Sequence, residues 1–257
     1  MKRIIALSMV LLPFLAFSQN HEKYLSKELV VGRDTLKYRI LYPENFCACE
    51  SYPVVFFLHG SGERGGDNQK QLTWGADVFL DSTFRKNHPA IVIFPQCPQG
   101  ERWFDNNNYE ALREDIERTE MSDIQQSKVS IMLDNLIDST QKWTYVDTDR
   151  YYIVGLSMGG FGIYELLSRR PDTFAAAVPI CGGGVLKDAK RYAENVSIWI
   201  FHGQTDDVVN VEYSRKMYDK LKSLGADVQY TEFPGVTHNS WTPAFATEGL
   251  MDWIFSK

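Results

Sequence analysis

Residues 151–171 read YYIVGLSMGGFGIYELLSRRP, and the character of the sequence changes in the middle of this stretch. Residues 151–154 are aromatic or β-branched, which is typical of a strand. After the glycines, apolar side chains recur at helical spacing until a proline ends the pattern. The stretch therefore predicts a strand that turns sharply into a helix, with Ser157 on the turn between Gly155 and Gly159.

Strand-like runs and helical patterns alternate along the rest of the chain. Several strand-like runs are continuously apolar, as expected of strands covered on both faces. The strands are expected at 28–32, 36–42, 54–58, 90–94, 151–154, 176–180, 198–201 and 228–233, and the helices at 122–143, 158–169, 211–224 and 241–255. This order predicts an α/β fold: a mostly parallel, doubly wound sheet of eight strands, in which the first two form an antiparallel hairpin. One domain is expected over residues 19–257.

The N-terminus has the three parts of a secretory signal peptide. Two basic residues precede an apolar run over 4–17, and small residues flank an expected cut after Ser18. The run is shorter than a membrane-spanning helix requires, and it contains Pro13. We expect residues 1–18 to be removed, so that a secreted or periplasmic chain begins at Gln19.

The expected signal peptide holds two of the 27 basic residues and none of the 33 acidic ones, so the mature chain has a net charge of −8. An acidic chain without a basic cluster argues against nucleic acid and anionic membrane surfaces as partners. No membrane insertion of the mature chain is expected. The oligomeric state is left open.

Four cysteines lie at positions whose spacing matches neither a disulfide framework nor a metal site. Pairing among Cys47, Cys49 and Cys97 is left open by the sequence. Cys181 ends an apolar run and is expected to be a small core residue. No cofactor and no metal are expected.

The serine turn predicts nucleophilic chemistry. In a doubly wound sheet, ligands meet the carboxyl ends of the strands, and a serine on this turn projects its oxygen there. Gly155 and Gly159 are small, which avoids collisions at so tight a turn. The backbone N–H of Met158, at the start of the helix, can stabilise a developing oxyanion.

A serine hydroxyl needs a base and, behind the base, an orienting acid. Of the five histidines, His238 lies in a loop between the last expected strand and the last expected helix, and the chain order Ser, Asp, His places the base last. The acid is expected after the strand 198–201, where Asp206 is favoured and Asp207 competes. The second oxyanion donor is expected in the loop after the strand 54–58, and we favour the N–H of Ser61.

The chain resembles the α/β-hydrolase superfamily, specifically secreted bacterial esterases of the phospholipase/carboxylesterase and feruloyl-esterase-like kind, which are often labelled predicted peptidases. The matching motifs are LHGSGERG (58–65), FPQCP with RW (94–98 and 102–103), GLSMGG (155–160), PICGGG (179–184), FHGQTDD (201–207) and EFPGVTHNSW (232–241). The resemblance implies Ser157, Asp206 and His238 as a catalytic triad, with the amides of Ser61 and Met158 as the oxyanion hole. The acidic segment 105–122 and the pair Cys47 and Cys49 depart from the family pattern.

The expected function is a serine carboxylesterase acting on small-molecule or polysaccharide-linked esters, with acyl or feruloyl groups as candidate substrates. The short interval between the strands at 176–180 and 198–201 leaves little room for a large lid, which favours an open crevice. Trp103 and Trp241 are candidates for stacking on a sugar or an aromatic acyl group. The segment 105–122 is either a solvated surface helix or a loop at the rim of the crevice. A serine peptidase of prolyl-oligopeptidase-like type and a catalytically silent binding module are the alternatives.

Overall fold

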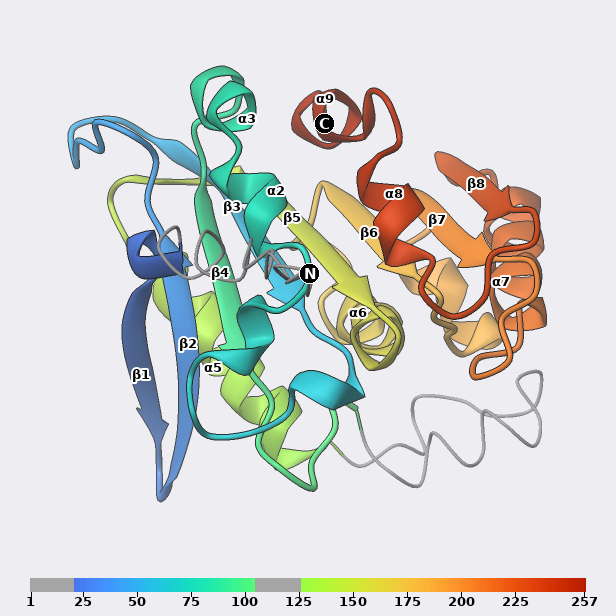
Figure 1. Cartoon of the computed structure of the whole chain (residues 1–257), viewed down its shortest axis with the longest axis horizontal. Coiled ribbons are helices and arrows are strands. Elements are labelled where there is room, and N and C mark those ends of the chain that lie inside the picture. Colours follow the sequence, from blue (N-terminus) through green and yellow to red (C-terminus); the bar gives the residue numbers. More distant parts are fainter. Residues whose placement is uncertain (1–20, 105–125) are drawn as a thin grey trace, which may run out of the picture.

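The computed structural model describes residues 21–104 and 126–257. Within these residues eight strands form one sheet in the order β1-β2-β4-β3-β5-β6-β7-β8 (Figure 1). The strands are β1 (Leu25–Val31), β2 (Asp34–Leu41), β3 (Tyr52–Leu58), β4 (Ile91–Gln96), β5 (Val146–Leu156), β6 (Ala176–Ile180), β7 (Ser197–Gly203) and β8 (Val228–Phe233). The pairs β1–β2 and β2–β4 are antiparallel, and the other neighbouring pairs are parallel. The predicted sheet with its antiparallel N-terminal hairpin is confirmed.

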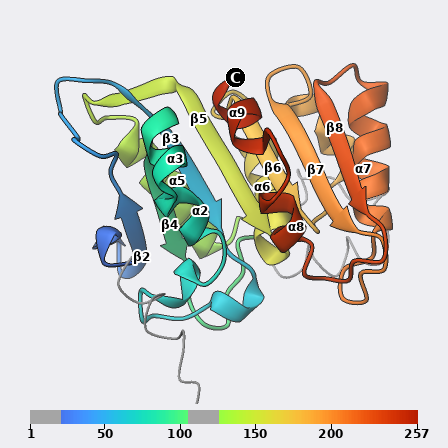
Figure 2. The same ribbon diagram turned by 45° about the horizontal axis from the view of Figure 1, so that its top comes forward.

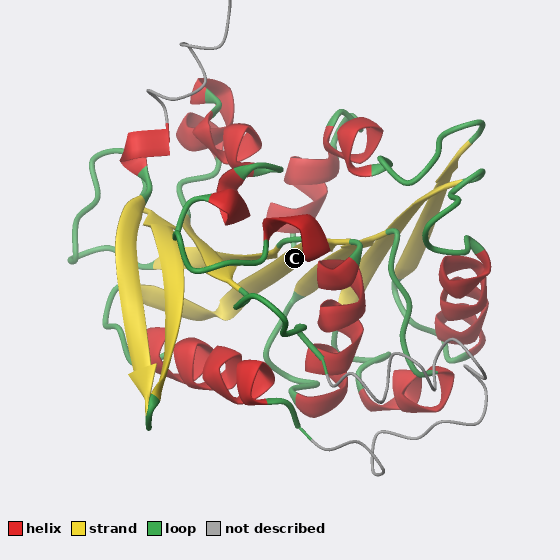
Figure 3. Ribbon diagram, turned by 60° about the horizontal axis from the view of Figure 1, so that its bottom comes forward, coloured by secondary structure: helices red, strands yellow, loops and turns green. Residues whose placement is uncertain are grey.

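Helices cover both faces of this sheet, as Figure 3 shows. One core contains side chains of α5 (Lys128–Thr140), α6 (Met158–Arg169) and α7 (Glu212–Ser223). The other contains side chains of α2 (Ala76–Leu80), α3 (Ser82–Asn87), α8 (Trp241–Phe245) and α9 (Leu250–Phe255).

The central strand β3 shows why the sequence needs continuous apolar runs. All of its residues are buried. Val54, Phe56 and Leu58 belong to the first core, and Val55 and Phe57 belong to the second. Because successive side chains of a strand point to opposite faces, a strand between two layers of helices requires apolar residues at every position.

The predicted bounds agree with the structure where one pattern gives way clearly to another. The helix expected at 158–169 and the strands expected at 176–180 and 228–233 have these bounds in the structure. α5 begins later than the sequence pattern, at Lys128, where the hydroxyl of Ser127 accepts a hydrogen bond from the N–H of Ser130 at 3.1 Å. This is an N-cap contact that satisfies a backbone donor without an intrahelical partner.

Two regions differ from the expectation. The helix expected at 241–255 is two short helices, α8 and α9, because the chain passes through Gly249 with φ of 76°, a left-handed conformation that interrupts a helix. Between β3 and β4 the structure has α2 and α3, which the sequence analysis did not anticipate. Helices of five and six residues are too short to produce a clear periodicity.

The parallel strands end at one edge of the molecule. β2 lies toward one side of the sheet and β8 and α7 lie at the other, while the arrowheads of β5, β7 and β8 point to the same end (Figure 2). The loops that follow β3, β5, β6, β7 and β8 therefore meet there. In a doubly wound sheet, this is where ligands bind.

Two expectations fall outside the described residues: the signal peptide at 1–18 and the acidic segment 105–122. Of the residues that the structure describes, none belongs to a helix long and apolar enough to cross a membrane. Cys47 and Cys49 form a disulfide, whereas Cys97 and Cys181 are free and buried. Between β6 and β7 the chain forms a single 3₁₀ helix, Leu186–Arg191, in keeping with the short interval in the sequence.

Candidate active site

Ser157 occupies a sharp turn between β5 and α6. Its backbone has φ of 53° and ψ of −118°, an unusual conformation for a residue with a side chain. Such a conformation costs about 1–3 kcal/mol and persists only where the surroundings hold it. Here the N–H of Ser157 donates to the carbonyl of Ile180 at 2.9 Å, and the helix begins at the next residue.

The glycines beside Ser157 are required by space. A Cβ on Gly159 would lie 1.9 Å from the carbonyl oxygen of Leu58, at the end of β3. A Cβ on Gly155 would lie 2.8 Å from the carbonyl oxygen of Gly159. Neither glycine has a positive φ, so the absence of a side chain, rather than backbone freedom, is what the turn needs here. The expectation that small residues flank Ser157 therefore has a direct geometric cause.

The structure brings together the three residues expected to form the triad. The Oγ atom of Ser157 lies 3.0 Å from Nε2 of His238, and Nδ1 of His238 lies 2.8 Å from Oδ2 of Asp206. A carboxylate only accepts hydrogen bonds, so Nδ1 carries the hydrogen and Nε2 is free to accept the serine hydroxyl. The neutral imidazole is thus held in the tautomer that a general base requires.

Asp206 has a buried carboxylate with four donors around it. Its side chain is 0% exposed. Oδ2 faces both His238 and Nε2 of His202, the latter at 3.2 Å, and Oδ1 accepts the N–H groups of Val208 and Val209 at 2.9 and 2.8 Å. Burial would raise the pKa of Asp206, but the hydrogen bonds from His202, His238 and the two amides outweigh it and hold the pKa well below its usual value. Its competitor Asp207 is exposed to solvent.

His202 is a buried residue of the site to which the sequence analysis gave no role in the chemistry. Its Nε2 lies 3.0 Å from the carbonyl oxygen of Val209 as well as close to Asp206, so this nitrogen carries a hydrogen that both acceptors share. Nδ1 lies 2.7 Å from the hydroxyl of Ser214 on α7. The ring therefore ties the loop that carries Asp206 to the helix that follows it. In the sequence, this residue stands out only as the histidine of a His-Gly pair, residues 202–203, at the end of β7.

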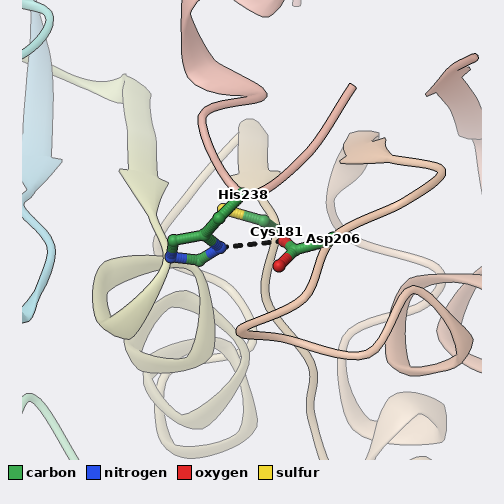
Figure 4. Close-up of side chains that lie close together, drawn as sticks. All are labelled: Cys181, Asp206 and His238. Atoms are coloured by element: carbon green, nitrogen blue, oxygen red, sulfur yellow. Dashed lines mark hydrogen bonds and ion pairs between the residues drawn. The ribbon is translucent and has the colours of Figure 1, made fainter. Parts of the chain in front are cut away.

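Cys181 packs beside the histidine and the aspartate (Figure 4). Ligand atoms of Cys181, Asp206 and His238 lie within 4.8 Å of one another, the one cluster of this kind within residues 21–104 and 126–257. Two ligand atoms on one tetrahedral Zn²⁺ would lie about 3.3 Å apart, given bonds of about 2.0 Å. The 2.8 Å between His238 and Asp206 instead fits a hydrogen bond. Burial raises the pKa of the Cys181 thiol to about 12, so the thiol keeps its proton at neutral pH.

The loop after β3 lies next to the serine. A Cβ on Gly60 would lie 3.6 Å from Cβ of Ser157. Ser61, the expected oxyanion donor, begins a 3₁₀ turn (Ser61–Glu63) directly after this glycine. Met158, the other expected donor, is the first residue of α6, and the first N–H groups of a helix have no acceptor within it.

The two tryptophans expected at the substrate site differ in their surroundings. Trp103 is 1% exposed, and its indole N–H donates to the carbonyl of His59 at 2.9 Å, which assigns it to the core rather than to substrate contact. Trp241 meets the ring of His238 edge to face, with centroids 5.4 Å apart. Trp74, which the sequence analysis did not single out, pairs with Trp241 at 5.6 Å and is 37% exposed.

The buried histidine of the β3 loop predicts a pH dependence of stability. Burial lowers the pKa of His59 to about 4; its bond to the carbonyl of Gly60 opposes the shift and Arg64 adds to it. Because this value lies below that of an unfolded histidine, about 6.5, the unfolded chain takes up the proton first as the pH falls. The folded state therefore loses stability as the pH falls from about 6.5 to about 4.

We expect His59→Asn to remove this contribution. Between about pH 7 and pH 4, the free energy of unfolding of the wild type should fall by roughly 3 kcal/mol more than that of the variant. Urea unfolding at a series of pH values measures the difference. Parallel pH profiles for the two proteins would contradict the assignment of a neutral, buried His59.

Relatives of this chain include enzymes of two reaction classes. A bifunctional acetylxylan esterase/xylanase from Neocallimastix patriciarum is 29% identical over 187 residues, which are 72% of this chain and 23% of that protein. A probable dipeptidyl-peptidase 5 from Aspergillus terreus is 27% identical over 233 residues, covering 77% of this chain and 30% of that protein. The chain thus spans less than a third of either relative.

The solved structure of a thermostable esterase has the same fold, with a TM-score of 0.81 and 32% identity over 93% of this chain and 64% of that one. The sequence model of the phospholipase/carboxylesterase family matches residues 48–247. This range contains the serine turn, the loop of Asp206 and the loop of His238. The chain belongs to the phospholipase/carboxylesterase family of the α/β-hydrolase fold.

Proposed function

We propose that this chain is a serine carboxylesterase that forms an acyl-enzyme on Ser157. The observation that carries the proposal is the continuous hydrogen-bonded chain from Ser157 through His238 to Asp206, built on a strained turn at the start of a helix. The membership of an esterase family supports it.

In the first half of the reaction, Oγ of Ser157 attacks the ester carbonyl while Nε2 of His238 takes the hydroxyl proton. The carbonyl oxygen becomes an oxyanion, which the N–H groups of Ser61 and Met158 stabilise. The bond to the alcohol then breaks, and His238 returns its proton to the departing oxygen. In the second half a water molecule gives its proton to His238 and attacks the acyl-enzyme, which releases the acid and restores the serine.

Asp206 acts through the histidine. When His238 takes the serine proton it becomes an imidazolium, and the buried carboxylate 2.8 Å from Nδ1 stabilises that charge. The lowered pKa of Asp206 keeps it ionised at neutral pH. The second histidine, His202, and two backbone amides keep the carboxylate in place while the charge on His238 changes.

For the substrate we propose acyl or feruloyl esters of polysaccharides. The similarity to an acetylxylan esterase/xylanase supports a polysaccharide-linked ester. Trp241, edge to face with His238, and the exposed Trp74 beside it offer an apolar wall next to the reacting groups. Such a wall suits a planar aromatic acyl group or a sugar ring.

A serine peptidase with the same three residues is the second candidate. The similarity to a dipeptidyl-peptidase favours it, because acyl transfer from an amide uses the same nucleophile, base and oxyanion donors. Parallel assays on p-nitrophenyl esters and aminoacyl p-nitroanilides separate the two candidates. Hydrolysis of the anilides without hydrolysis of the esters would replace the esterase proposal with the peptidase.

A fluorophosphonate probe tests the nucleophile. We expect stoichiometric labelling of the wild type at Ser157 alone, because its hydroxyl contacts the imidazole of His238 and is partly exposed, whereas the hydroxyl of Ser214, which contacts His202, is fully buried. Ser157→Ala should show no labelling and no esterase activity above background. Mass spectrometry of the labelled peptide identifies the site. Stoichiometric labelling of the Ser157→Ala variant would contradict the assignment of Ser157 as the nucleophile.

Two neighbouring acids give a matched pair of variants. Asp206→Asn should lower kcat on p-nitrophenyl acetate by about 10⁴, the scale of losing a triad carboxylate. Asp207→Asn changes an exposed carboxylate that is not part of the hydrogen-bonded triad and should leave kcat within about threefold, as is usual for a surface substitution. Steady-state kinetics decide the matter. The opposite ranking would exchange the roles of the two aspartates.

The aromatic wall predicts a split between binding and chemistry. Trp74→Ala should raise KM for a feruloyl ester by up to about tenfold, since an aromatic pair is worth about 0.5–1.5 kcal/mol. It should leave kcat on p-nitrophenyl acetate unchanged, because the lost contact is uniform binding. Trp143→Ala, at the amino end of β5, is the control and should change neither value. Equal loss on both substrates would assign Trp74 to the fold instead.

We also propose that the chain is exported. The charged and apolar pattern of residues 1–18 supports export, and the disulfide between Cys47 and Cys49 is compatible with an oxidising compartment. Protein recovered from the native exporting cell should begin at Gln19, which intact mass spectrometry measures. A soluble product that still carries Met1 would contradict the proposal.

A further inference from the structure

We propose that His59 is a positioning residue that turns the N–H of Ser61 toward the oxyanion. The inference rests on the proposed esterase function and adds a residue that the mechanism above does not use. His59 follows the last residue of β3 and is 1% exposed. A buried histidine with no direct part in the chemistry, placed one residue before the oxyanion loop, calls for a physical account.

The tautomer of His59 follows from its partners. The backbone N–H of Cys97, directly after β4, donates to Nε2 of His59 at 3.0 Å, so Nε2 carries no hydrogen. The proton of the neutral ring is therefore on Nδ1, which lies 2.6 Å from the carbonyl oxygen of Gly60 and donates to it. Burial lowers the pKa of the ring to about 4, which keeps the ring neutral at neutral pH.

This bond fixes the orientation of one peptide group. In a trans peptide the C=O and the following N–H point in opposite directions. The Gly60 carbonyl is drawn toward the buried ring of His59, so the N–H of Ser61 points away from the ring. The peptide group between Gly60 and Ser61 is thereby held, in the loop that lies next to Ser157.

The ring itself is held from two further directions. The carbonyl oxygen of His59 accepts the indole N–H of Trp103 at 2.9 Å, and the two rings pack with centroids 5.0 Å apart. With Cys97 on Nε2, the imidazole connects the ends of the adjacent strands β3 and β4 to the loop above them. A donor that is oriented before the reaction costs no reorganisation when the oxyanion forms.

Two substitutions separate the orienting bond from the remaining contacts. The amide of Asn reaches about as far as Nδ1, and the amide of Gln reaches about as far as Nε2. His59→Asn can therefore still donate to the carbonyl of Gly60, while His59→Gln keeps an acceptor for the N–H of Cys97 but loses the donor to Gly60. His88→Gln is the matched control, because His88 binds Asp252 on α9, away from the site.

The kinetic test compares these variants on p-nitrophenyl acetate and with a trifluoromethyl ketone, which adds to the serine as an oxyanion. His59→Gln should lower kcat by about 10²-fold, the scale of one oxyanion donor. It should weaken the binding of the ketone by a similar factor and change KM little. His59→Asn and His88→Gln should stay within about fivefold of the wild type, since they keep the donor. The proposal would be overturned if both His59 variants lost activity to the same extent and the loss followed the decrease in their melting temperatures.

Two further measurements test the role of His59 without relying on ester hydrolysis, and the second of them uses only the wild-type protein. A crystal structure of His59→Gln should show the Gly60–Ser61 peptide rotated, and an unchanged peptide would overturn the inference even if the protein hydrolysed no ester. In wild-type protein labelled with ¹⁵N-serine, the amide resonance of Ser61 should shift when the ketone binds. A ketone that labels Ser157 without moving this resonance would also overturn it. Absence of esterase activity in the wild type would count against the proposed function alone.

Discussion

The close approach of α6 to the end of β3 is the constraint on which the site depends. A side chain on Gly159 would collide with the carbonyl of Leu58, so only bare backbone allows the contact. The contact brings the first turn of α6, with its unpaired N–H groups and partial positive charge, to the carboxyl ends of the central strands. Ser157 takes its strained backbone conformation because the strand, the helix and the carbonyl of Ile180 hold it from three sides.

Two buried histidines have corresponding positions at the ends of β3 and β7. His59 donates to the carbonyl of Gly60, and His202 donates to the carboxylate of Asp206. Each ring supplies a directed hydrogen bond where water would otherwise solvate the backbone or the charge. In a buried setting such bonds are stronger than in water and change little during a reaction. Part of the electrostatic preorganisation of the site therefore comes from His59 and His202, which lie behind the residues that would contact the substrate.

The scaffold that holds Ser157 and the aromatic wall of Trp74 and Trp241 come from different parts of the chain. The sheet and α6 hold the proposed nucleophile Ser157, whereas Trp74 lies in the loop that precedes the short helix α2 and Trp241 is the first residue of α8. Loops at the ends of the strands can vary without disturbing the core, so one fold supports different substrates. The similarity of this chain both to an acetylxylan esterase/xylanase and to a dipeptidyl-peptidase fits this division.

The sequence by itself determined the sheet, the hairpin, the serine turn and the order of the site residues, because periodicity, glycine placement and chain order are local signals. It favoured Asp206 but left Asp207 as a competitor, since adjacent acids differ only in where the folded loop points them. It placed Trp103 at the site and overlooked Trp74, although the structure buries the first and exposes the second. These choices depend on contacts between elements distant in sequence. Only the packed tertiary structure creates those contacts, so only it could decide them.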